Sequence, residues 1–296
     1  MNSNSVCIAC LAGKQEKQIA KFNDEAKKNE YMQKVHNLLE KYGYTESSPW
    51  LAEKLEELYV DFWKEKEDFT EIKHRYNQLL LSKEAGLEEK IKNADDPIKE
   101  CIKYVCAANY IDFSAVENVN ESTFESLLKK AGEEKVSDTE LSFFKKDLSN
   151  AKKLVYMTDN CGEVLIDKIF IKFLMKENPK LSVTAIVRGK NVINDATLED
   201  AEEVGLTDII PCIGNGNAAP GSVLSRFTKE ALDTLRAADM VIAKGQGNFE
   251  GLYGEGINPY FLFLCKCTLF QTRFGLKQYS SVFSKEERIK AVNEVK

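Results

Sequence analysis

The sequence predicts an α/β protein in which a mainly helical N-terminal region precedes a doubly wound sheet of parallel or mostly parallel strands. Two observations support this fold class. The first hundred residues place apolar side chains at helical spacing between charged ones. Later in the chain, short apolar runs alternate with amphipathic segments, which is typical of repeated strand–helix units in one sheet. We therefore expect a helical domain over residues 1–110 and an α/β domain over residues 111–296.

The helical region carries clear start and stop signals. Ser48-Pro49 and Asp96-Pro97 each place a capping side chain before a proline, and proline is favoured in the first helical turn. Gly43 ends the first helical pattern, and Gly86 is a candidate break in the third. The expected helices span residues 14–41, 48–62, 70–93 and 96–108, and polar helical sequence over residues 117–150 leads into the sheet.

The strands are expected where the apolar runs are continuous, because strands buried on both faces carry few polar residues. The first four expected strands span residues 154–157, 183–187, 208–212 and 240–243. The pattern is weaker after residue 258. There we expect an apolar helix near residues 260–265, a strand near 268–270 and a last strand near 281–283.

The composition limits the kinds of binding partner that we expect for this protein. The 296 residues are 43% hydrophobic, which allows a large core, and the net charge of −6 argues against nucleic acid as the main partner. No apolar run reaches membrane-spanning length, and the N-terminus lacks the basic start and apolar stretch of a signal peptide. We expect a cytoplasmic protein with no membrane partner. The sequence leaves the oligomeric state open.

The eight cysteines are expected to be free thiols or metal ligands rather than disulfides, because no export signal is visible. Cys7 and Cys10 have the spacing of half a zinc site, and whether they bind a structural metal stays open. The two histidines, His36 and His74, lie beside apolar neighbours in helical sequence and are interpreted as packing residues.

Polar, glycine-containing segments follow all of the first four expected strands. Asp159-Asn160 follows the first, Asn194-Asp195 lies shortly after the second, and Lys244-Gly245 follows the fourth. Taken singly, these residues are explained as helix caps or surface turns. The carboxyl ends of parallel strands meet at one edge of a sheet, where α/β proteins bind their ligands. The sequence therefore favours one shared site, with the glycine-rich loop over residues 214–221 long enough to close over a ligand.

The residue types at these strand ends indicate a metal and a phosphate. Asp159 and Asn160 offer hard oxygen ligands that suit Mg²⁺ or Mn²⁺, and Asp195 is able to complete the set. Lys244, followed by Gly245 and Gly247, is a plausible phosphate-binding turn. Neither a Walker loop nor a GxGxxG segment follows the relevant strands, which argues against a nucleotide-dependent transferase.

Several of these segments together resemble the damage-control phosphatase family, formerly a domain of unknown function (number 89). The matching segments are Asp159-Asn160-Cys161-Gly162-Glu163, Ile193-Asn194-Asp195-Ala196-Thr197, Lys244-Gly245-Gln246-Gly247-Asn248-Phe249-Glu250 and Lys266-Cys267. The Cys7/Cys10 pair and Asn109-Tyr110-Ile111-Asp112 resemble its microbial, cysteine-containing branch. The resemblance implies an N-terminal helical bundle and a three-layer α/β/α, Rossmann-like domain with a mixed sheet of about six strands.

The resemblance also implies roles for individual residues. Asp159, Asn160 and Asp195 would bind the metal, and Glu163 would lie near the substrate. The residues implied to bind phosphate are Lys244, Gly245, Gly247 and Asn248, with Lys266 as a second cation; Asp159, Asp195 and Lys244 would be catalytic. A role for Asn109 stays open, because Ala108 stands where the family usually has glycine.

The expected function is hydrolysis of small phosphate monoesters, such as sugar phosphates or damaged phosphometabolites. The expected cofactor is a divalent metal ion, Mn²⁺ or Mg²⁺, with Co²⁺ or Ni²⁺ as further candidates. The attacking nucleophile is either a metal-bound water or an aspartate. The main alternative is a metal-dependent sensor that binds a phosphorylated metabolite without turning it over.

Overall fold

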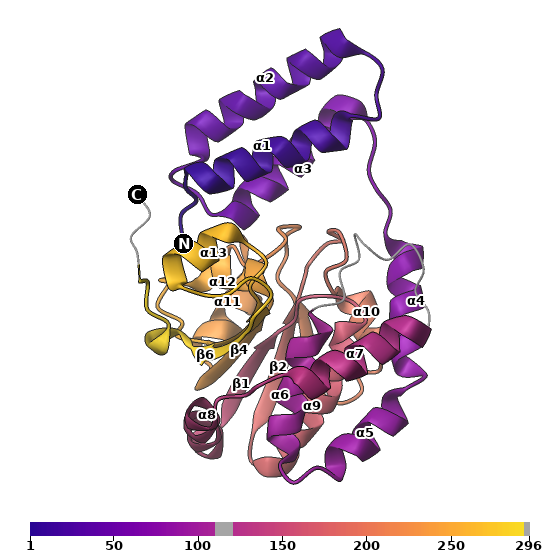
Figure 1. Ribbon diagram of the computed structural model, residues 1–296, viewed down its shortest axis with the longest axis vertical. Helices are drawn as coiled ribbons and strands as arrows, with labels where there is room; N and C mark the ends of the chain where they lie inside the picture. The colour runs from indigo at the N-terminus through magenta and orange to yellow at the C-terminus, as the bar shows by residue number, and fades with distance from the viewer. Residues whose placement is uncertain (110–120, 293–296) are drawn as a thin grey trace.

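The computed structural model describes residues 1–109 and 121–292. In these residues the chain forms helices on both faces of one sheet, with three further helices beyond one end of it (Figure 1). The helices are α1 (Ser5–Ile19), α2 (Glu25–Tyr42), α3 (Ser48–Trp63), α4 (Thr70–Leu81), α5 (Glu84–Lys92), α6 (Pro97–Ala108), α7 (Glu121–Glu133), α8 (Asp138–Asn150), α9 (Glu163–Glu177), α10 (Leu198–Glu203), α11 (Lys229–Arg236), α12 (Gln246–Leu252) and α13 (Thr268–Phe274).

In the described part of the chain the sheet has six strands, in the order β3-β2-β1-β4-β5-β6. All neighbours pair in parallel except β5 and β6, which are antiparallel, so the expected mixed sheet of about six strands is confirmed. The strands are β1 (Lys153–Met157), β2 (Ser182–Val187), β3 (Cys212–Gly214), β4 (Met240–Lys244), β5 (Tyr260–Leu264) and β6 (Ser281–Lys285).

The strand order creates a switch point between β1 and β4. After β1 the chain builds β2 and β3 on one side, and then returns to place β4 and β5 on the other. Met157 at the end of β1 pairs with Ala243, next to the last residue of β4. Ligands of open α/β sheets bind in the crevice at such a point. The fold therefore brings the residues after β1 and β4 into one place.

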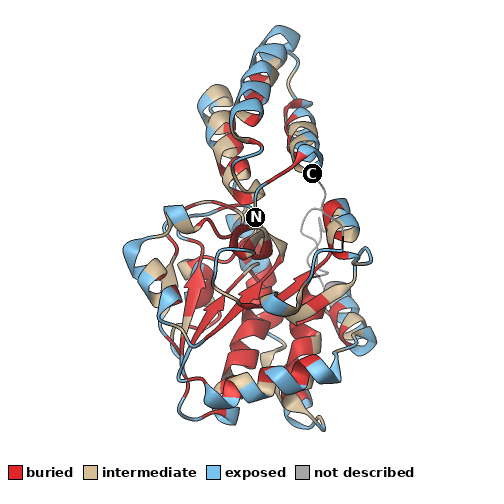
Figure 2. Cartoon of the chain, turned by 90° about the vertical axis from the view of Figure 1, so that its left-hand side faces the viewer, coloured by how far each residue is buried: buried red, intermediate tan, exposed pale blue. Residues whose placement is uncertain are grey.

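Two hydrophobic clusters cover the two faces of the sheet, and buried residues concentrate between the layers (Figure 2). One cluster joins the sheet to helices that include α6, α8 and α9, and the other joins it to α11, α12 and α13. The α/β/α sandwich is thus built on apolar burial at both faces.

Helices α1 to α3 have a hydrophobic cluster of their own, centred on buried Tyr31, Leu55 and Tyr59. Helices α4 to α6 instead contribute to the cluster on one face of the sheet, where α6 packs against α9. The packing therefore associates α4 to α6 with the sheet, and a domain boundary at residue 110 stays a prediction.

The elements after residue 258 were assigned wrongly from the sequence. Residues 260–264 form strand β5 instead of a helix, because all five side chains are buried between β4 and β6. Residues 268–274 form helix α13 instead of a strand, with Leu269, Phe270 and Phe274 facing the core. The strand expected at 281–283 is confirmed as β6.

Three further boundaries differ from the expected ones. The helix expected over residues 14–41 is broken into α1 and α2 by a turn after Ile19, where Asp24 caps the second helix. The third helix breaks at Ser82 and Lys83, ahead of Gly86. The strand expected at 208–212 begins only at Cys212, because Pro211 lacks an N–H and residues 206–210 form turns.

Among residues 1–109 and 121–292, no helix combines the length and apolar character needed to cross a bilayer.

Candidate functional site

The site is built where β1 and β4 end. Asp159 and Asn160 follow β1, and Gly245 follows β4 with φ at +79°. A Cβ atom on Gly245 would lie 2.0 Å from Cγ of Asp159, so only glycine leaves room for this carboxylate. The N–H of Gly245 donates to the carbonyl of Leu262 at 2.9 Å and thus extends the sheet. A role of Gly245 in binding substrate stays a prediction.

The segment after β2 is hydrogen-bonded to the end of β1. The Ala196 N–H donates to the Asp159 carbonyl, and the Cys161 N–H donates to the Asn194 carbonyl, both at 2.8 Å. Asn160 and Asp195 are bridge partners in an antiparallel arrangement. The three residues predicted to bind metal, Asp159, Asn160 and Asp195, are therefore brought together by backbone hydrogen bonds between segments far apart in the sequence.

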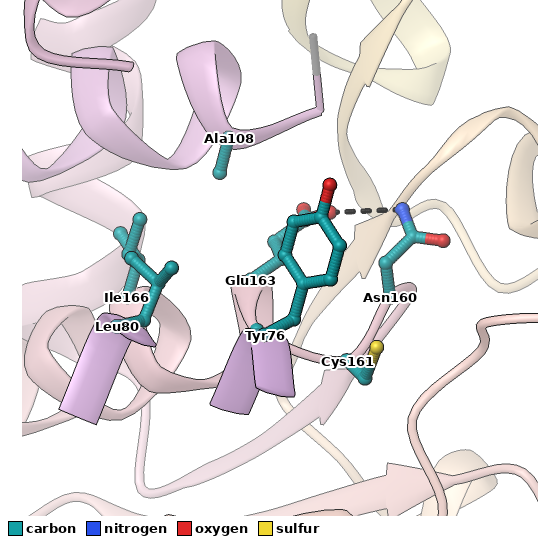
Figure 3. A pocket seen from close by; sticks show the side chains of 8 residues that line it. Tyr76, Leu80, Ala108, Asn160, Cys161, Glu163 and Ile166 are labelled. Carbon is teal, nitrogen blue, oxygen red and sulfur yellow. Dashed lines mark hydrogen bonds between the residues drawn. The ribbon is translucent and has the colours of Figure 1, made fainter. Parts of the chain in front are cut away.

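Two amide groups hold two carboxylates in one cluster. The Asn160 amide Nδ2 donates to Asp159 Oδ2 at 2.9 Å and to Glu163 Oε2 at 3.0 Å, the latter drawn in Figure 3. The Asn109 Nδ2 donates to the same two oxygens, both at 3.0 Å. Asp159 Oδ2 and Glu163 Oε2 thus face a common position. Asn109, whose role the sequence left open, is a buried member of this cluster.

Arg188 is a site residue that was not predicted from the sequence. It follows β2 directly, and its Nε donates to Asp195 Oδ2 at 2.5 Å. Its Nη1 donates to Asn248 Oδ1 at 2.9 Å, and its Nη2 lies 3.8 Å from Asp159 Oδ1. The side chain is only 2% exposed. The sequence does contain a signal for this residue, because Arg188 is a charged residue immediately after a buried strand.

Lys244 lies beneath the cluster and is fully buried. Its ammonium group donates to Glu163 Oε1 and, at 3.1 Å, to Asp167 Oδ1. Tyr156 donates to the same Asp167 oxygen at 2.6 Å. Two of the three ammonium protons are thus engaged with carboxylates, and the binding of phosphate by Lys244 stays a prediction. Asp167 was missed, although an aspartate four residues after Glu163 in an apolar helix is an unusual feature.

Asn248 makes hydrogen bonds to four other residues of the site. Its Nδ2 donates to the carbonyls of Thr158 and Lys244 at 3.0 and 2.7 Å. Its Oδ1 accepts from the Ser222 hydroxyl at 2.8 Å as well as from Arg188. Asn248 is fully buried, so in this structure it fixes neighbouring segments, and its predicted contact with substrate stays a prediction.

The remaining predicted residues lie around this core. A Cβ atom on Gly247 would lie 2.2 Å from the Pro220 carbonyl oxygen, so Gly247 permits close packing of the glycine-rich loop. Lys266 is exposed after β5, where its N–H donates to Gln246 Oε1 at 3.1 Å. Its position next to the turn after β4 places it at the rim of the site.

The glycine-rich loop over residues 214–221 is held closely by its neighbours. Asn215, Asn217 and Ala219 are buried. The Ala218 N–H donates to Glu53 Oε1 of α3 at 3.0 Å, and Arg226 pairs with the same carboxylate at 2.8 Å. Helix α3 therefore contacts the loop that the sequence predicted to close over a ligand.

A small pocket lies beside Glu163, which forms part of its wall (Figure 3). Its volume of about 10 Å³ has room for about one water molecule. Apart from Asn160 and Glu163, the wall is largely apolar. The lining residues are Tyr76, Leu80, Ala108, Asn160, Cys161, Gly162, Glu163 and Ile166.

The electrostatics of the site show an excess of negative charge. Burial, together with the carboxylates of Asp195 and Glu163, raises the pKa of Asp159 to about 7. Burial raises the pKa of Asp195 as well, although the Arg188 guanidinium opposes this shift. For Lys244, burial lowers the pKa, but the carboxylates of Asp167 and Glu163 outweigh it and raise the pKa above its usual value.

The donor set fits a hard divalent cation. Asp159 and Asp195 offer carboxylate oxygens, and Asn160 adds an amide oxygen that already accepts from Asn194 Nδ2 at 2.8 Å and has a second lone pair. In the described part of the chain, no group of three or more His, Cys, Asp and Glu side chains is arranged to hold a metal. Amide, water and substrate oxygens would have to complete the coordination, as is usual for Mg²⁺.

Other sequence candidates lie outside this cluster. Tyr110, Ile111 and Asp112 are outside the described residues. Cys7 is partly buried and Cys10 is exposed on α1, and metal binding by this pair stays a prediction. The two histidines were expected to be packing residues, but His36 and His74 are both exposed, and His74 pairs with Glu203.

Comparisons with known proteins agree on one family. The model of the damage-control phosphatase ARMT1-like domain matches residues 3–282. The chain is 29% identical over 274 residues to a damage-control phosphatase of Archaeoglobus fulgidus, a match that covers 90% of this chain and 93% of the relative. It is 31% identical over 171 residues to a damage-control phosphatase of Pyrococcus horikoshii, which covers 56% of this chain and 57% of the relative.

A solved structure has the same architecture. The crystal structure of a DUF89 family protein from Pyrococcus horikoshii matches with a TM-score of 0.81 at 25% sequence identity, covering 97% of this chain and 99% of the other. The similarity therefore extends over the α1 to α3 bundle as well as the sheet.

Proposed function

The chain belongs to the damage-control phosphatase ARMT1-like family, and on this premise we propose that it is a divalent-metal-dependent phosphatase of small phosphate monoesters. Two relatives that carry the name damage-control phosphatase support the reaction class. The proposed substrates are sugar phosphates or damaged phosphometabolites. The proposed cofactor is Mn²⁺ or Mg²⁺, with Co²⁺ and Ni²⁺ as further candidates.

The observation that carries this proposal is the convergence of carboxylate and amide oxygens at the switch point of the sheet. Asp159, Asn160 and Asp195 come from two strand ends and are held together by backbone hydrogen bonds. Such hard oxygen ligands suit Mg²⁺ or Mn²⁺, which also binds substrate phosphates. When bound, the ion would neutralise charge on a phosphoryl oxygen and act as a Lewis acid.

The chain's own residues would prepare the site for this chemistry. Asp159, Asn160 and Asp195 would hold the ion, and Arg188 keeps Asp195 oriented through its 2.5 Å hydrogen bond. Asn109 fixes the carboxylates of Asp159 and Glu163 relative to each other. A site arranged in advance needs little reorganisation when charge develops in the transition state.

The ammonium groups of Lys244 and Lys266 would interact with the phosphate in two different ways. Lys244 is buried and paired, so it would supply a fixed positive charge beneath the phosphoryl group, with Glu163 and Asp167 setting its position. Lys266 is exposed at the rim and would draw the dianion towards the site. Gly245, Gly247 and Asn248 would shape the turn against which the phosphate lies.

The test is hydrolysis of an aryl phosphate by protein stripped of metal and then resupplied with Mg²⁺, Mn²⁺, Co²⁺ or Ni²⁺. We expect activity to return with at least one ion, and to stay about 10³-fold lower in Asp159→Asn at every metal concentration. Asp61→Asn is a matched control, because Asp61 is exposed on α3 and pairs only with neighbouring Lys64 among the described contacts.

The alternative function is a metal-dependent sensor that binds a phosphorylated metabolite without hydrolysing it. Folded wild-type protein that binds a divalent ion and a phosphate ester, but shows no turnover with any of the four ions, would establish the sensor and overturn the phosphatase.

A further inference from the structure

The turn over residues 192–195 lies beside the site and carries an unusual residue at its second position. The Asp195 N–H donates to the Val192 carbonyl at 3.0 Å and closes the turn. Ile193 follows Val192 with φ at +43°. This region is unfavourable for a β-branched residue, because its Cβ approaches the following carbonyl oxygen. Glycine or asparagine would occupy the position with less strain.

The turn cannot relax by moving away, because it is fixed to the end of β1. The Asn194 carbonyl accepts from the Cys161 N–H, and the Asn194 side chain donates to Asn160 Oδ1, both at 2.8 Å. Asp195 on the other side is held by Arg188. Strained conformations persist where the surroundings fix them, and they gather at functional sites.

Packing inside the protein does not explain the isoleucine either. Val192 is 9% exposed and Asp195 is 6% exposed, whereas Ile193 between them is 50% exposed. Ile193 is a member of none of the three hydrophobic clusters formed by the described residues. The position therefore combines an unfavourable backbone with an apolar side chain that is half in water.

We propose that Ile193 is a specificity-determining residue that contacts the non-phosphate part of the substrate. The inference rests on the proposed function, with the phosphate bound next to a metal ion that Asp159, Asn160 and Asp195 would hold. The fitting substrates are phosphate esters whose alcohol part presents an apolar or C–H-rich surface, such as an aryl group or one face of a sugar ring. Such a group would bury the exposed side chain, and that burial favours binding. Inorganic phosphate lacks this apolar group and would not contact Ile193.

The test compares wild type with Ile193→Asn, because asparagine tolerates the left-handed region and lacks the apolar surface. We expect KM for phenyl phosphate to rise about 5- to 10-fold, in line with the loss of one hydrophobic contact. The inhibition constant of inorganic phosphate should stay within about twofold of wild type. The Tm of ligand-free protein should rise by about 2–4 °C as backbone strain is relieved.

Lys64→Asn is the matched control, because Lys64 ends α3 with φ at +56° and lies in the helical bundle. It makes the same kind of backbone change and should leave KM for phenyl phosphate unaltered. An unchanged KM in Ile193→Asn overturns the proposal. So does an equal rise in KM and in the inhibition constant of inorganic phosphate, because the mutation would then have disturbed the phosphate site itself.

A calorimetric measurement separates this inference from the proposed function. It compares the binding of phenyl phosphate and of inorganic phosphate to wild type and to Ile193→Asn. If wild type shows no turnover, the phosphatase proposal fails. A selective loss of phenyl phosphate affinity in Ile193→Asn would still support the role of Ile193, and equal affinities in the two proteins would overturn it.

Discussion

Two buried ionic clusters lie close together in this protein, and they differ in charge balance. Lys73 of α4 and Asp200 of α10 form a one-to-one pair at 2.6 Å, with both side chains 6% exposed. The candidate site instead gathers more carboxylates than cations. Its carboxylates belong to Asp159, Glu163, Asp167 and Asp195, and its cations belong to Lys244 and Arg188.

The difference separates a structural role from a functional one. Lys73 and Asp200 neutralise each other, and Asp200 also accepts from Asn77 and Thr197, so this pair needs no ligand. The site retains negative charge that its own cations do not balance, and burial keeps water from screening it. Perturbed titratable groups in such places are characteristic of functional sites. A divalent cation would restore the balance.

The largest expected effect comes from removing one charge at each cluster. In Asp159→Asn we expect kcat/KM to fall about 10³-fold, because the essential carboxylate is lost. The free energy of unfolding of the metal-free protein should change by less than about 1 kcal/mol or rise, because repulsion from Asp195 and Glu163 is relieved. Steady-state hydrolysis and urea unfolding measure the two quantities.

The matched variant at the balanced pair is Asp200→Asn. It leaves Lys73 buried without its carboxylate, so we expect a loss of about 3–5 kcal/mol in the free energy of unfolding. The kcat/KM of the folded protein should stay within about threefold of wild type. If Asp200→Asn lost activity and kept its stability, the distinction between the two clusters would be wrong.

A smaller effect is expected from Gly245→Ala. The added Cβ would collide with the Asp159 carboxylate, and the φ of +79° is unfavourable for alanine. We expect a loss of about 2–4 kcal/mol in the free energy of unfolding, together with lower activity as Asp159 is displaced. Gly254→Ala is the control, because Gly254 has φ at +85° and open space around its Cα. Backbone strain alone should cost about 1 kcal/mol there. Equal losses in the two variants would show that Asp159 moves aside without cost.

The most gradual effect concerns pH and metal, because it is spread over several pH units. The pKa of Asp159 is raised from 3.8 to about 7 in the folded protein. Between these values the folded state binds more protons than the unfolded state, so the stability of metal-free protein should fall as pH rises from about 4 to about 7. A shift of about three pKa units corresponds to a contribution on the order of 4 kcal/mol. Urea unfolding at several pH values measures it, and the slope should flatten in Asp159→Asn.

Metal binding should compete with protonation of the Asp159 carboxylate. Since a carboxylate must be deprotonated to bind an ion, Mg²⁺ or Mn²⁺ should raise the Tm more at pH 8 than at pH 5. An equal shift at both pH values would mean that the ion binds elsewhere.

The sequence was informative where the signal is local. Asp159, Asn160, Asp195 and Lys244 were predicted at strand ends, because an apolar run followed by polar residues and glycine specifies a buried strand and its turn. Residues 260–264 carry no such local signal. A run of five apolar residues has no periodicity of its own, and only pairing with β4 and β6 makes it a strand.

By itself, then, the sequence determined the fold class, the edge of the sheet at which polar residues gather and the family to which they belong. The tertiary structure alone decided which side chains meet. Lys244 faces Glu163 and Asp167 across 81 and 77 residues of chain, and Asn109 reaches Asp159 across 50. Such partners are chosen by the packing of distant elements, because a buried charge must find a counter-charge in space and not along the chain.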